Sequence, residues 1–403
     1  MLRNVVVVGA SLAGLRAAET LRQDGYDGRI VLVGTEEHLP YDRPPLSKQL
    51  LAGKCTLDQI ALRRDGYEDL DLDLQLGRRA TALDLDSQEV AVDDLERIGF
   101  EALVIATGAS PRQLPGTPPL EGIHLLRTVD DCLAIRSDLD RVLASGGRVV
   151  VVGAGFIGSE VAATCRMAGA DVTVLEALAT PLSRALGEEM GAACGELHHA
   201  NDVDLRTGAG VSGFLGTHRV EGVLLNDGSE VEAELVVVGV GVKPNTEWLE
   251  SSGLKLHDGV VCDATSLAAP GIVAAGDVAR WHNPLFDTDM RVEHWTNAAE
   301  QGMAAARTLL AGPEKAEPFA PVPYFWSDQY KTKIQFVGHV HHADDVRVVD
   351  GSPQEGKFLA LYEHAGRLVG ASGFSRPKLV LQCRRLIAER ATVDDTIAQL
   401  GER

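Results

Sequence analysis

Three glycines and one acid stand at a spacing that suits the binding of a dinucleotide. The glycines are Gly153, Gly155 and Gly158, and the acid is Glu176, 23 positions after Gly153. A carboxylate at this place can accept hydrogen bonds from both adenosine ribose hydroxyls, and it would repel a 2′-phosphate. No Arg or Lys follows Glu176 before Arg184. The stretch therefore predicts binding of NADH in preference to NADPH, against the alternative of a packing turn that binds nothing.

A similar turn lies near the start of the chain. Gly9 and Gly14 frame Ser11, which stands where the motif G-x-G-x-x-G has its middle glycine. A serine is small enough to let phosphate groups approach, so this turn predicts a second nucleotide site or a simple packing turn. The run that follows at 39–48, Leu-Pro-Tyr-Asp-Arg-Pro-Pro-Leu-Ser-Lys, is less ordinary and ends in Lys48.

Elements in the same order surround both turns. The apolar periodicity predicts strand, helix and strand at 5–8, 15–22 and 30–33, and again at 148–152, 159–167 and 172–175. Such a unit aims backbone N–H groups and the positive end of a helix at a pyrophosphate. Two units in one chain predict one tightly bound redox cofactor and one diffusible nicotinamide nucleotide.

The rest of the chain is α/β in pattern. Buried strands are expected at 102–105, at 231–242 and just before Asp277, and a helix is expected through Leu310. The four prolines of 312–323 predict a linker, and a small α/β domain is expected from Tyr324 onward, ending in a helix at 393–400. These elements predict a first dinucleotide-binding domain at 1–112 with 243–322, a second at 113–242, and a C-terminal domain at 323–403.

Composition excludes several classes of function. The 403 residues include 58 acids against 38 Lys and Arg, a formal charge of −20, which argues against nonspecific nucleic-acid binding. No signal peptide and no apolar run of the ~20 residues that span a bilayer are recognised, so the cytoplasm and no membrane contact are expected. The six cysteines are scattered without a C-x-x-C pair. Cys55 alone is left as a candidate for a peroxidase-type thiol, no metal site is expected, and His198–His199 and His341–His342 are expected at the surface.

Five motifs in order resemble the FAD-containing, NADH-dependent ferredoxin reductases of bacterial oxygenase systems, the group that includes putidaredoxin reductase. The motifs are residues 39–48, Ala106–Gly108, the second glycine turn continuing into Ser159–Glu160, Gly276–Asp277 with Trp295-x-Asn297-Ala298, and Phe325–Gln329. The resemblance covers about 5–338 and implies a glutathione reductase-like fold with two dinucleotide-binding domains, of which the first binds FAD and the second NAD. Proteins with a redox disulfide keep their cysteines where this chain has 43–48.

The resemblance also implies roles for individual residues. Asp277 would hold the ribityl chain of FAD, and Thr107 and Gly108 would lie behind the nucleotide. The acid that binds the ribose of FAD is assigned to Glu36, with Glu37 as the alternative. The remaining residues implied along FAD are Gly9, Ser11, Ala13, Gly14, Arg43, Lys48, Ala80, Arg127, Gly276 and Trp295. Those implied along NADH are Gly153, Gly155, Ile157, Gly158, Glu160, Glu176, Arg184 and Gly241.

Four side chains are expected to serve catalysis. An ion pair of Lys48 with Glu160 would shape the hydride pocket, the ammonium stabilising negative charge on reduced flavin and the carboxylate contacting the nicotinamide carboxamide. The alternative is two exposed charges on unrelated elements, worth about 0–1 kcal/mol even if paired. Trp295 is expected at the flavin edge and Trp326 at the opposite, protein-facing side, against the alternative of ordinary core aromatics.

The predicted reaction is hydride transfer from NADH to FAD, followed by single-electron transfer to a [2Fe–2S] ferredoxin. Docking of an acidic ferredoxin would need a basic patch, for which the candidates are Arg63, Arg64, Lys331, Lys333, Arg384 and Arg385. The alternative interpretation, that these are ordinary solvated surface charges, fits the sequence at least as well. Alternatives are a rubredoxin reductase, an NADH oxidase using a thiol such as Cys55, and an NADH-responsive binding flavoprotein like apoptosis-inducing factor. A monomer or weak dimer is expected.

Overall fold

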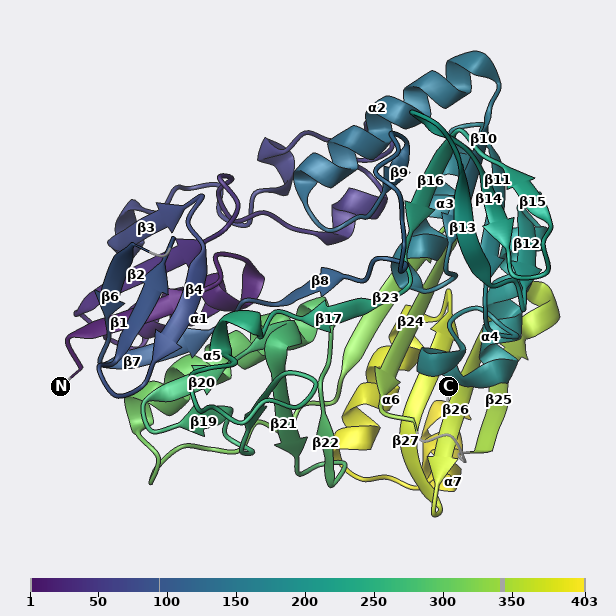
Figure 1. The fold of residues 1–403 in the computed structure, drawn as a ribbon. Helices are drawn as coiled ribbons and strands as arrows, with labels where there is room; N and C mark the ends of the chain where they lie inside the picture. Colours follow the sequence, from purple (N-terminus) through teal and green to yellow (C-terminus); the bar gives the residue numbers. More distant parts are fainter. Residues whose placement is uncertain (1, 94, 341–344, 402–403) are drawn as a thin grey trace. The chain divides into compact units, whose positions relative to one another are not determined.

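The computed structural model describes residues 2–93, 95–340 and 345–401, and the chain in it separates into two compact units (Figure 1). Unit 1 comprises Met1–Asp42, Asp58–Ser110 and Lys243–Pro323. Unit 2 comprises Arg43–Leu57, Pro111–Val242 and Tyr324–Arg403. The segment that carries Lys48 thus packs with the second glycine turn, although the sequence predictions grouped it with the first. The division into FAD, NAD and C-terminal domains stays a prediction.

Unit 1 is built on a six-stranded sheet in the order β19-β20-β7-β1-β2-β3. Its strands are β1 Asn4–Val8, β2 Arg29–Gly34, β3 Leu72–Leu76, β7 Ala102–Ile105, β19 Leu267–Ala269 and β20 Ile272–Ala274. The core strands β1, β2 and β7 are parallel neighbours, with Val6 beside Val31 and Leu103. Because successive side chains point to opposite faces and both faces are covered, these strands are apolar throughout.

Two layers cover that sheet. Val5 and Val7 face helices α1 (Leu12–Gln23) and α5 (Trp295–Ala311), whereas Val6 and Val8 face a layer that includes Leu83 and Trp281. The second layer contains the sheet of β4 Ala80–Asp84, β5 Glu89–Val92 and β6 Glu96–Gly99, and that of β18 Val260–Cys262, β21 Ala279–Asn283 and β22 Thr288–Met290. Helix α1 therefore starts at the carboxyl end of β1, where a nucleotide is expected.

Unit 2 repeats the arrangement around the second glycine turn. Its parallel sheet has the order β12-β11-β10-β16-β9, from β9 Ile123–His124, β10 Arg148–Val152, β11 Asp171–Glu176, β12 Asp204–Thr207 and β16 Leu235–Val238. Helices α2 Val129–Ser145 and α3 Phe156–Met167 pack on it, with α4 Ser183–His199 following β11. A three-stranded sheet of β13 Val211–Gly216, β14 Val220–Leu225 and β15 Glu230–Glu232 buries its apolar side against Val150 and Val152.

One strand predicted from sequence is wrong. The stretch 231–242 is not continuous; it is divided among β15, β16 and β17 Val242–Pro244. β15 pairs antiparallel with β14, whereas β16 pairs parallel with β10, so the chain changes sheets between them. The fully apolar part, Leu235–Val238, is the buried parallel strand. β8 Ala109–Pro111 is a further short strand.

The C-terminal part of unit 2 is an antiparallel sheet with two helices. The strand order is β23-β24-β27-β26-β25, from β23 Tyr324–Gln329, β24 Thr332–Gly338, β25 Asp345–Ser352, β26 Lys357–His364 and β27 Arg367–Phe374. Helices α6 Pro377–Ala388 and α7 Val393–Gly401 follow (Figure 1). Phe325 and Phe336 of the sheet join one core with Leu186 and Met190 of α4. Among the described residues, no helix is long and apolar enough to cross a membrane.

Candidate functional site

The three glycines of the second turn have different surroundings. A Cβ on Gly153 would lie 2.4 Å from the carbonyl oxygen of Gly239, and one on Gly158 would lie 2.0 Å from that of Gly153. A Cβ on Gly155 would meet no protein atom within 4 Å. The first and third glycines are therefore required by packing. The open space at the second suits a pyrophosphate that approaches the backbone closely.

Helix α3 begins at this turn with its first N–H groups uncapped by a side chain. Its N-cap is Gly155, and the side chain of Ser11, which holds the same position before α1, does not cap that helix either. Unsatisfied N–H groups and the positive helix end favour an anion at both turns. Ile157 lies in the first turn of α3 and Ala13 in the first turn of α1. Both turns therefore fit a dinucleotide phosphate.

Glu176 lies at the end of β11, beside the glycine turn. Its Oε2 accepts a hydrogen bond from the N–H of Ala154 (2.7 Å), and its Oε1 accepts one from the N–H of Leu178 (2.8 Å). Each carboxylate oxygen keeps a further lone pair that can accept a hydroxyl. Arg184 is exposed in the first turn of α4, and Gly241 takes a left-handed backbone with φ +100°.

Glu160, in the second turn of α3, is a buried carboxylate that receives four hydrogen bonds. Its Oε2 accepts from Nζ of Lys48 (2.6 Å) and from Oγ of Ser47 (2.5 Å). Its Oε1 accepts from Oγ of Ser327 (2.9 Å) and from the N–H of Asp328 (3.2 Å). The predicted ion pair of Lys48 with Glu160 is present, and the alternative of two exposed charges is wrong: their side chains are 11% and 6% exposed.

The four donors come from two separate stretches of unit 2, 47–48 and 327–328. Ser47 and Lys48 end a short 3-10 helix (Pro44–Ser47), whose place is fixed because Oγ of Thr164 on α3 donates to the carbonyl of Ser47 (2.7 Å). Ser327 lies on β23, and Nε2 of the buried Gln329 donates to its hydroxyl (3.3 Å). A buried charge costs several kcal/mol unless it is paired and hydrogen-bonded. This carboxylate meets that condition and is held in one orientation.

Ser47, Ser327 and the N–H of Asp328 were not predicted as site residues. Both serines stand inside the motifs quoted above, and the alternation of β23 places Phe325, Ser327 and Gln329 on its buried face. A buried serine between two buried side chains was the available signal, because a hydroxyl there needs a partner. The sequence could not name that partner, which lies 167 positions away.

In unit 1 the first turn is packed as tightly as the second. A Cβ on Gly9 would lie 2.1 Å from the carbonyl oxygen of Ala106, and one on Gly14 would lie 1.9 Å from that of Gly9. Glu36 accepts a hydrogen bond from the hydroxyl of Tyr41, while the side chain of Glu37 lies against Gly77. Both acids follow β2, so the assignment of the ribose acid to Glu36 stays a prediction.

The other residues predicted along FAD divide between the two units. In unit 1, Thr107 and Gly108 form the turn after β7, and Asn245 holds both of them by hydrogen bonds. The side chain of Asn245 donates to the carbonyl of Thr107 (2.8 Å), and its N–H donates to the carbonyl of Gly108 (2.9 Å). The N–H of Gly276, which precedes Asp277, donates to Gln301 (2.9 Å), and Ala80 opens β4. In unit 2, Arg43 donates to the carbonyl of Arg127 (2.5 Å).

Neither predicted tryptophan is a fully buried core side chain. Trp295 opens α5 and its Nε1 donates to Asp42 (2.6 Å), so both belong to unit 1. Trp326 lies on the half-buried face of β23 and stacks on Tyr324 with ring centroids 5.9 Å apart. The guanidinium of Arg384 lies 6.0 Å from the Tyr324 ring centroid. A cation and two aromatic rings thus adjoin on one face of unit 2.

Most of the candidate docking cations have local partners. Arg63 pairs with Glu19 (2.9 Å) and Asp69 (2.6 Å), Lys333 pairs with Asp328 (2.7 Å), and Arg385 pairs with Glu389 (2.8 Å). Arg64 donates to the carbonyl of Gln59 (3.2 Å) and Lys331 lies exposed in the turn after β23. Arg384 lies over the ring of Tyr324, on which the predicted site residue Trp326 stacks.

Thiol and metal chemistry have little support among the described residues. All six cysteines are free and five are buried; burial raises the pKa of the sixth, Cys55, which disfavours a reactive thiolate. No group of three metal-binding side chains is found in the described part of the chain. His198 is wholly buried, contrary to expectation, with Nδ1 2.8 Å from the Tyr330 hydroxyl, and burial lowers its pKa to about 4. His341–His342 lie outside the described residues.

Comparisons with known proteins agree with these features. A family model described as pyridine nucleotide-disulphide oxidoreductase matches residues 3–302, and one described as reductase C-terminal matches residues 324–399. Putidaredoxin reductase CamA of Pseudomonas putida is 36% identical over 403 residues, covering 98% of this chain and 94% of that protein. The ferredoxin–NAD(+) reductase component of the anthranilate 1,2-dioxygenase system of Burkholderia cepacia is 38% identical over 395 residues, covering 96% and 95%.

A solved structure extends the likeness to the whole fold. The reductase chain in the crystal structure of the covalent putidaredoxin reductase–putidaredoxin complex superposes with a TM-score of 0.92 at 35% identity. The match covers 100% of this chain and 99% of that one. The glutathione reductase-like fold class expected from sequence is confirmed.

Proposed function

Because the chain belongs to the pyridine nucleotide-disulphide oxidoreductase family, we propose that it is an FAD-dependent NADH:ferredoxin reductase. It takes a hydride from NADH and passes single electrons to a [2Fe–2S] ferredoxin that feeds an oxygenase. Bound FAD supplies the conversion of a hydride into two single electrons. The observation that carries the proposal is the buried pair of Lys48 with Glu160, and Glu160 lies on α3, the helix that starts at the NADH turn.

Unit 2 supplies the groups that bind and orient the nicotinamide nucleotide. The turn at Gly155 receives the pyrophosphate, and Glu176 receives the adenosine ribose. Glu160, whose acceptor sites are filled by its four donors, fixes the position of Lys48, and Lys48 balances its charge. A contact of this carboxylate with the carboxamide would displace one of the four donors. Orientation of this kind is the main contribution that a protein makes to a reaction whose chemistry belongs to the cofactor.

A second face of unit 2 suits contact with the electron acceptor. Trp326 stacks on Tyr324, and Arg384 lies over Tyr324. A cation beside aromatic rings suits an acidic partner, because Arg and aromatic residues are enriched where interfaces bind tightly. The cytoplasm, where NADH is formed, is the proposed compartment.

The proposed function is tested by following one turnover without oxygen. The FAD-loaded protein is mixed with NADH, and flavin absorbance is recorded during reduction and then during reoxidation by a [2Fe–2S] ferredoxin. Fast reduction followed by fast reoxidation by the ferredoxin, but slow reoxidation by oxygen, is expected. Slow reduction with a long-lived NADH complex would favour a binding flavoprotein. Rapid reaction of the reduced flavin with oxygen would indicate an oxidase, and reoxidation by rubredoxin alone would indicate a rubredoxin reductase.

Replacement of Glu176 by Gln should weaken the preference for NADH. The neutral amide keeps one acceptor oxygen but no longer repels a 2′-phosphate, and it presents a donor to the N–H of Ala154 or of Leu178. We expect KM for NADH to rise about tenfold, the equivalent of about 1.4 kcal/mol, with a smaller change for NADPH. Steady-state reduction with each nucleotide measures the ratio. Glu188→Gln, an exposed acid on α4, is the matched control, and an unchanged NADH to NADPH ratio in Glu176→Gln would contradict the assignment.

A further inference from the structure

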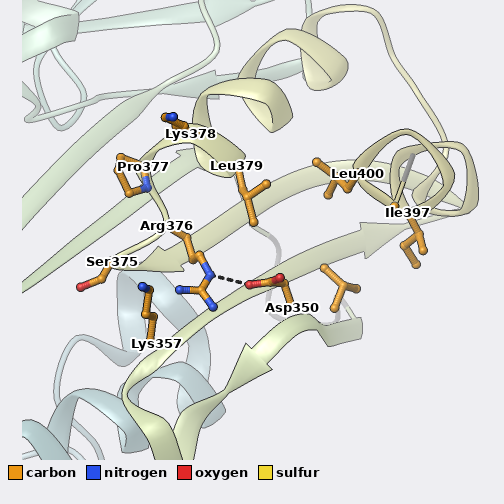
Figure 2. A pocket seen from close by; sticks show the side chains of 11 residues that line it. Asp350, Lys357, Ser375, Arg376, Pro377, Lys378, Leu379, Ile397 and Leu400 are labelled. Carbon is orange, nitrogen blue, oxygen red and sulfur yellow. Dashed lines mark hydrogen bonds and ion pairs between the residues drawn. The ribbon is translucent and has the colours of Figure 1, made fainter. Parts of the chain in front are cut away.

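A pocket of about 760 Å³ opens in the C-terminal part of unit 2, and none of the residues assigned to nucleotide or acceptor lines it (Figure 2). Its lining comes from β25, β26, α6 and α7 and includes Val349, Lys357, Arg376, Leu379, Ile397 and Leu400. The volume lies within the range of sites that bind small molecules, about 300–1,000 Å³. Neither the predicted site nor the candidate docking cations use any of these side chains.

One side of the pocket carries positive charge. The side chain of Arg376 is 20% exposed, and among the described residues the hydrogen-bond partner of its guanidinium is Asp350, to which Nε donates. An arginine has five N–H donors, so the Nη groups of Arg376 retain donors for a ligand. Lys357, whose amino group lies on the same side in Figure 2, has no ion pair within the described residues. Two cations with one carboxylate leave this side with a net positive charge.

The backbone around these cations departs from regular geometry. β25 contains a bulge at Val349, because Val348 pairs with Ala360 and Asp350 pairs with Leu359. Ser375, just before Arg376, takes a left-handed backbone with φ +54°, which is rare for a residue with a side chain. A Cβ on Gly351 would lie 3.1 Å from Nη2 of Arg376. Bulges and left-handed residues commonly aim side chains at functional positions.

The other side of the pocket is apolar. Leu379, Leu400 and Ile397 lie away from Lys357 and Ser375 in Figure 2, and Val349 also lines the pocket. Ile397 and Leu400 of α7 are only half-buried, so apolar surface remains open to a ligand. Burying it would contribute about 25 cal/mol per Å². A bare inorganic anion would use the charge of this pocket but not its apolar side.

We infer that this pocket binds a small organic anion with an apolar body, of the class of the aryl carboxylates. The acidic group lies against Arg376 and Lys357, since a guanidinium matches the two oxygens of a carboxylate. The apolar body lies on Leu379, Ile397 and Leu400. The site is separate from the proposed redox chemistry and binds whether or not the flavin is reduced.

The test is calorimetric titration of the FAD-loaded full chain with 2-naphthoate, in saturating NAD(+) so that the nicotinamide site is filled. Naphthoate is expected to bind, and 2-naphthamide, its neutral analogue, to bind at least about tenfold more weakly, the loss expected for a charge-assisted hydrogen bond. Inorganic phosphate should bind more weakly than naphthoate. Equal affinity for naphthoate and naphthamide, phosphate binding as tightly as naphthoate, or no naphthoate binding would overturn the inference.

Two variants locate the binding within the pocket. Lys357→Gln removes a cation without breaking an ion pair of the described residues, so the fold should be kept while naphthoate affinity falls at least about fivefold. Leu400→Asn should lower naphthoate affinity without changing the weak phosphate binding. Lys315→Gln, an exposed lysine of unit 1, is the matched control and should bind naphthoate as the unmodified protein does. Equal affinities for Lys357→Gln and Lys315→Gln would show that naphthoate binds elsewhere.

Discussion

Replacement of Glu160 by Gln should slow the reduction of flavin by NADH by about 100-fold, the size of effect seen when one preorganised electrostatic group is lost. The carboxylate accepts from two donors at each oxygen. A glutamine has one acceptor oxygen, so its NH₂ group would face two donors in either orientation, and Lys48 would lose its counter-charge. Both changes disturb the hydrogen bonds that fix Lys48 and its surroundings at the proposed nicotinamide site. Stopped-flow absorbance of the flavin under anaerobic conditions measures the rate.

Two further variants separate this effect from a loss of stability. Removing one partner of a buried pair lowers the free energy of unfolding by about 3–5 kcal/mol. The double variant Lys48→Met with Glu160→Gln removes both charges and should recover part of that stability, but not the rate. Ser327→Ala keeps the charge and removes one donor, so a slowing of about tenfold is expected. A reduction rate in Glu160→Gln within threefold of the unmodified protein, about 0.6 kcal/mol, would rule out the proposed role.

Replacement of Gly155 by Ala should raise the dissociation constant for NADH by about 100-fold or more while leaving the fold intact. Its φ of −75° suits any residue, and the added methyl group would meet no protein atom within 4 Å. The cost therefore falls on the ligand, since the methyl group occupies the space through which the pyrophosphate approaches. About 2.7 kcal/mol corresponds to this factor. Titration of the FAD-loaded protein with NAD(+) measures binding, and thermal unfolding reports stability.

Gly213→Ala provides the matched control for Gly155→Ala. Gly213 lies in β13 of the same unit, and a Cβ there also meets nothing within 4 Å. It should bind the nucleotide unchanged. Gly158→Ala, by contrast, should unfold or fail to accumulate, because its Cβ would lie 2.0 Å from a backbone oxygen. If Gly155→Ala bound NAD(+) as tightly as Gly213→Ala, the pyrophosphate could not lie at this turn.

The sequence predicted the parts of the fold that local pattern determines. Both strand–turn–helix units are present, and α3 starts at Phe156, three residues before its expected start, because Gly155 can serve as an N-cap. The pairing of Lys48 with Glu160 was also predicted, although 112 positions separate them, because each belongs to a motif of the resemblance. The prediction of one continuous strand at 231–242 was wrong, because a run of apolar residues does not show where the chain leaves one sheet and enters another.

Contacts between distant residues limited the prediction of the site. Ser327 looked like any serine in a strand until its hydroxyl was found against Glu160. Arg63 looked like a free cation, but Glu19, 44 positions away in the sequence, already pairs with it. His198 was expected at the surface, yet Tyr330 and the packing of α4 enclose it. In each case the deciding partner is fixed by tertiary structure and not by neighbouring sequence.

Successive side chains of β23 point to opposite faces, so the contact with Glu160 and the proposed acceptor surface both depend on the register of this one strand. Ser327 points inward to Glu160, and Trp326, its neighbour, points to the half-buried face with Tyr324. Inserting or deleting one residue before them would exchange their faces, so the hydrogen bond to Glu160 and the stacking on Tyr324 would be lost together. Relatives that serve other acceptors are thus expected to differ here by substitution alone, with the length of this strand held constant.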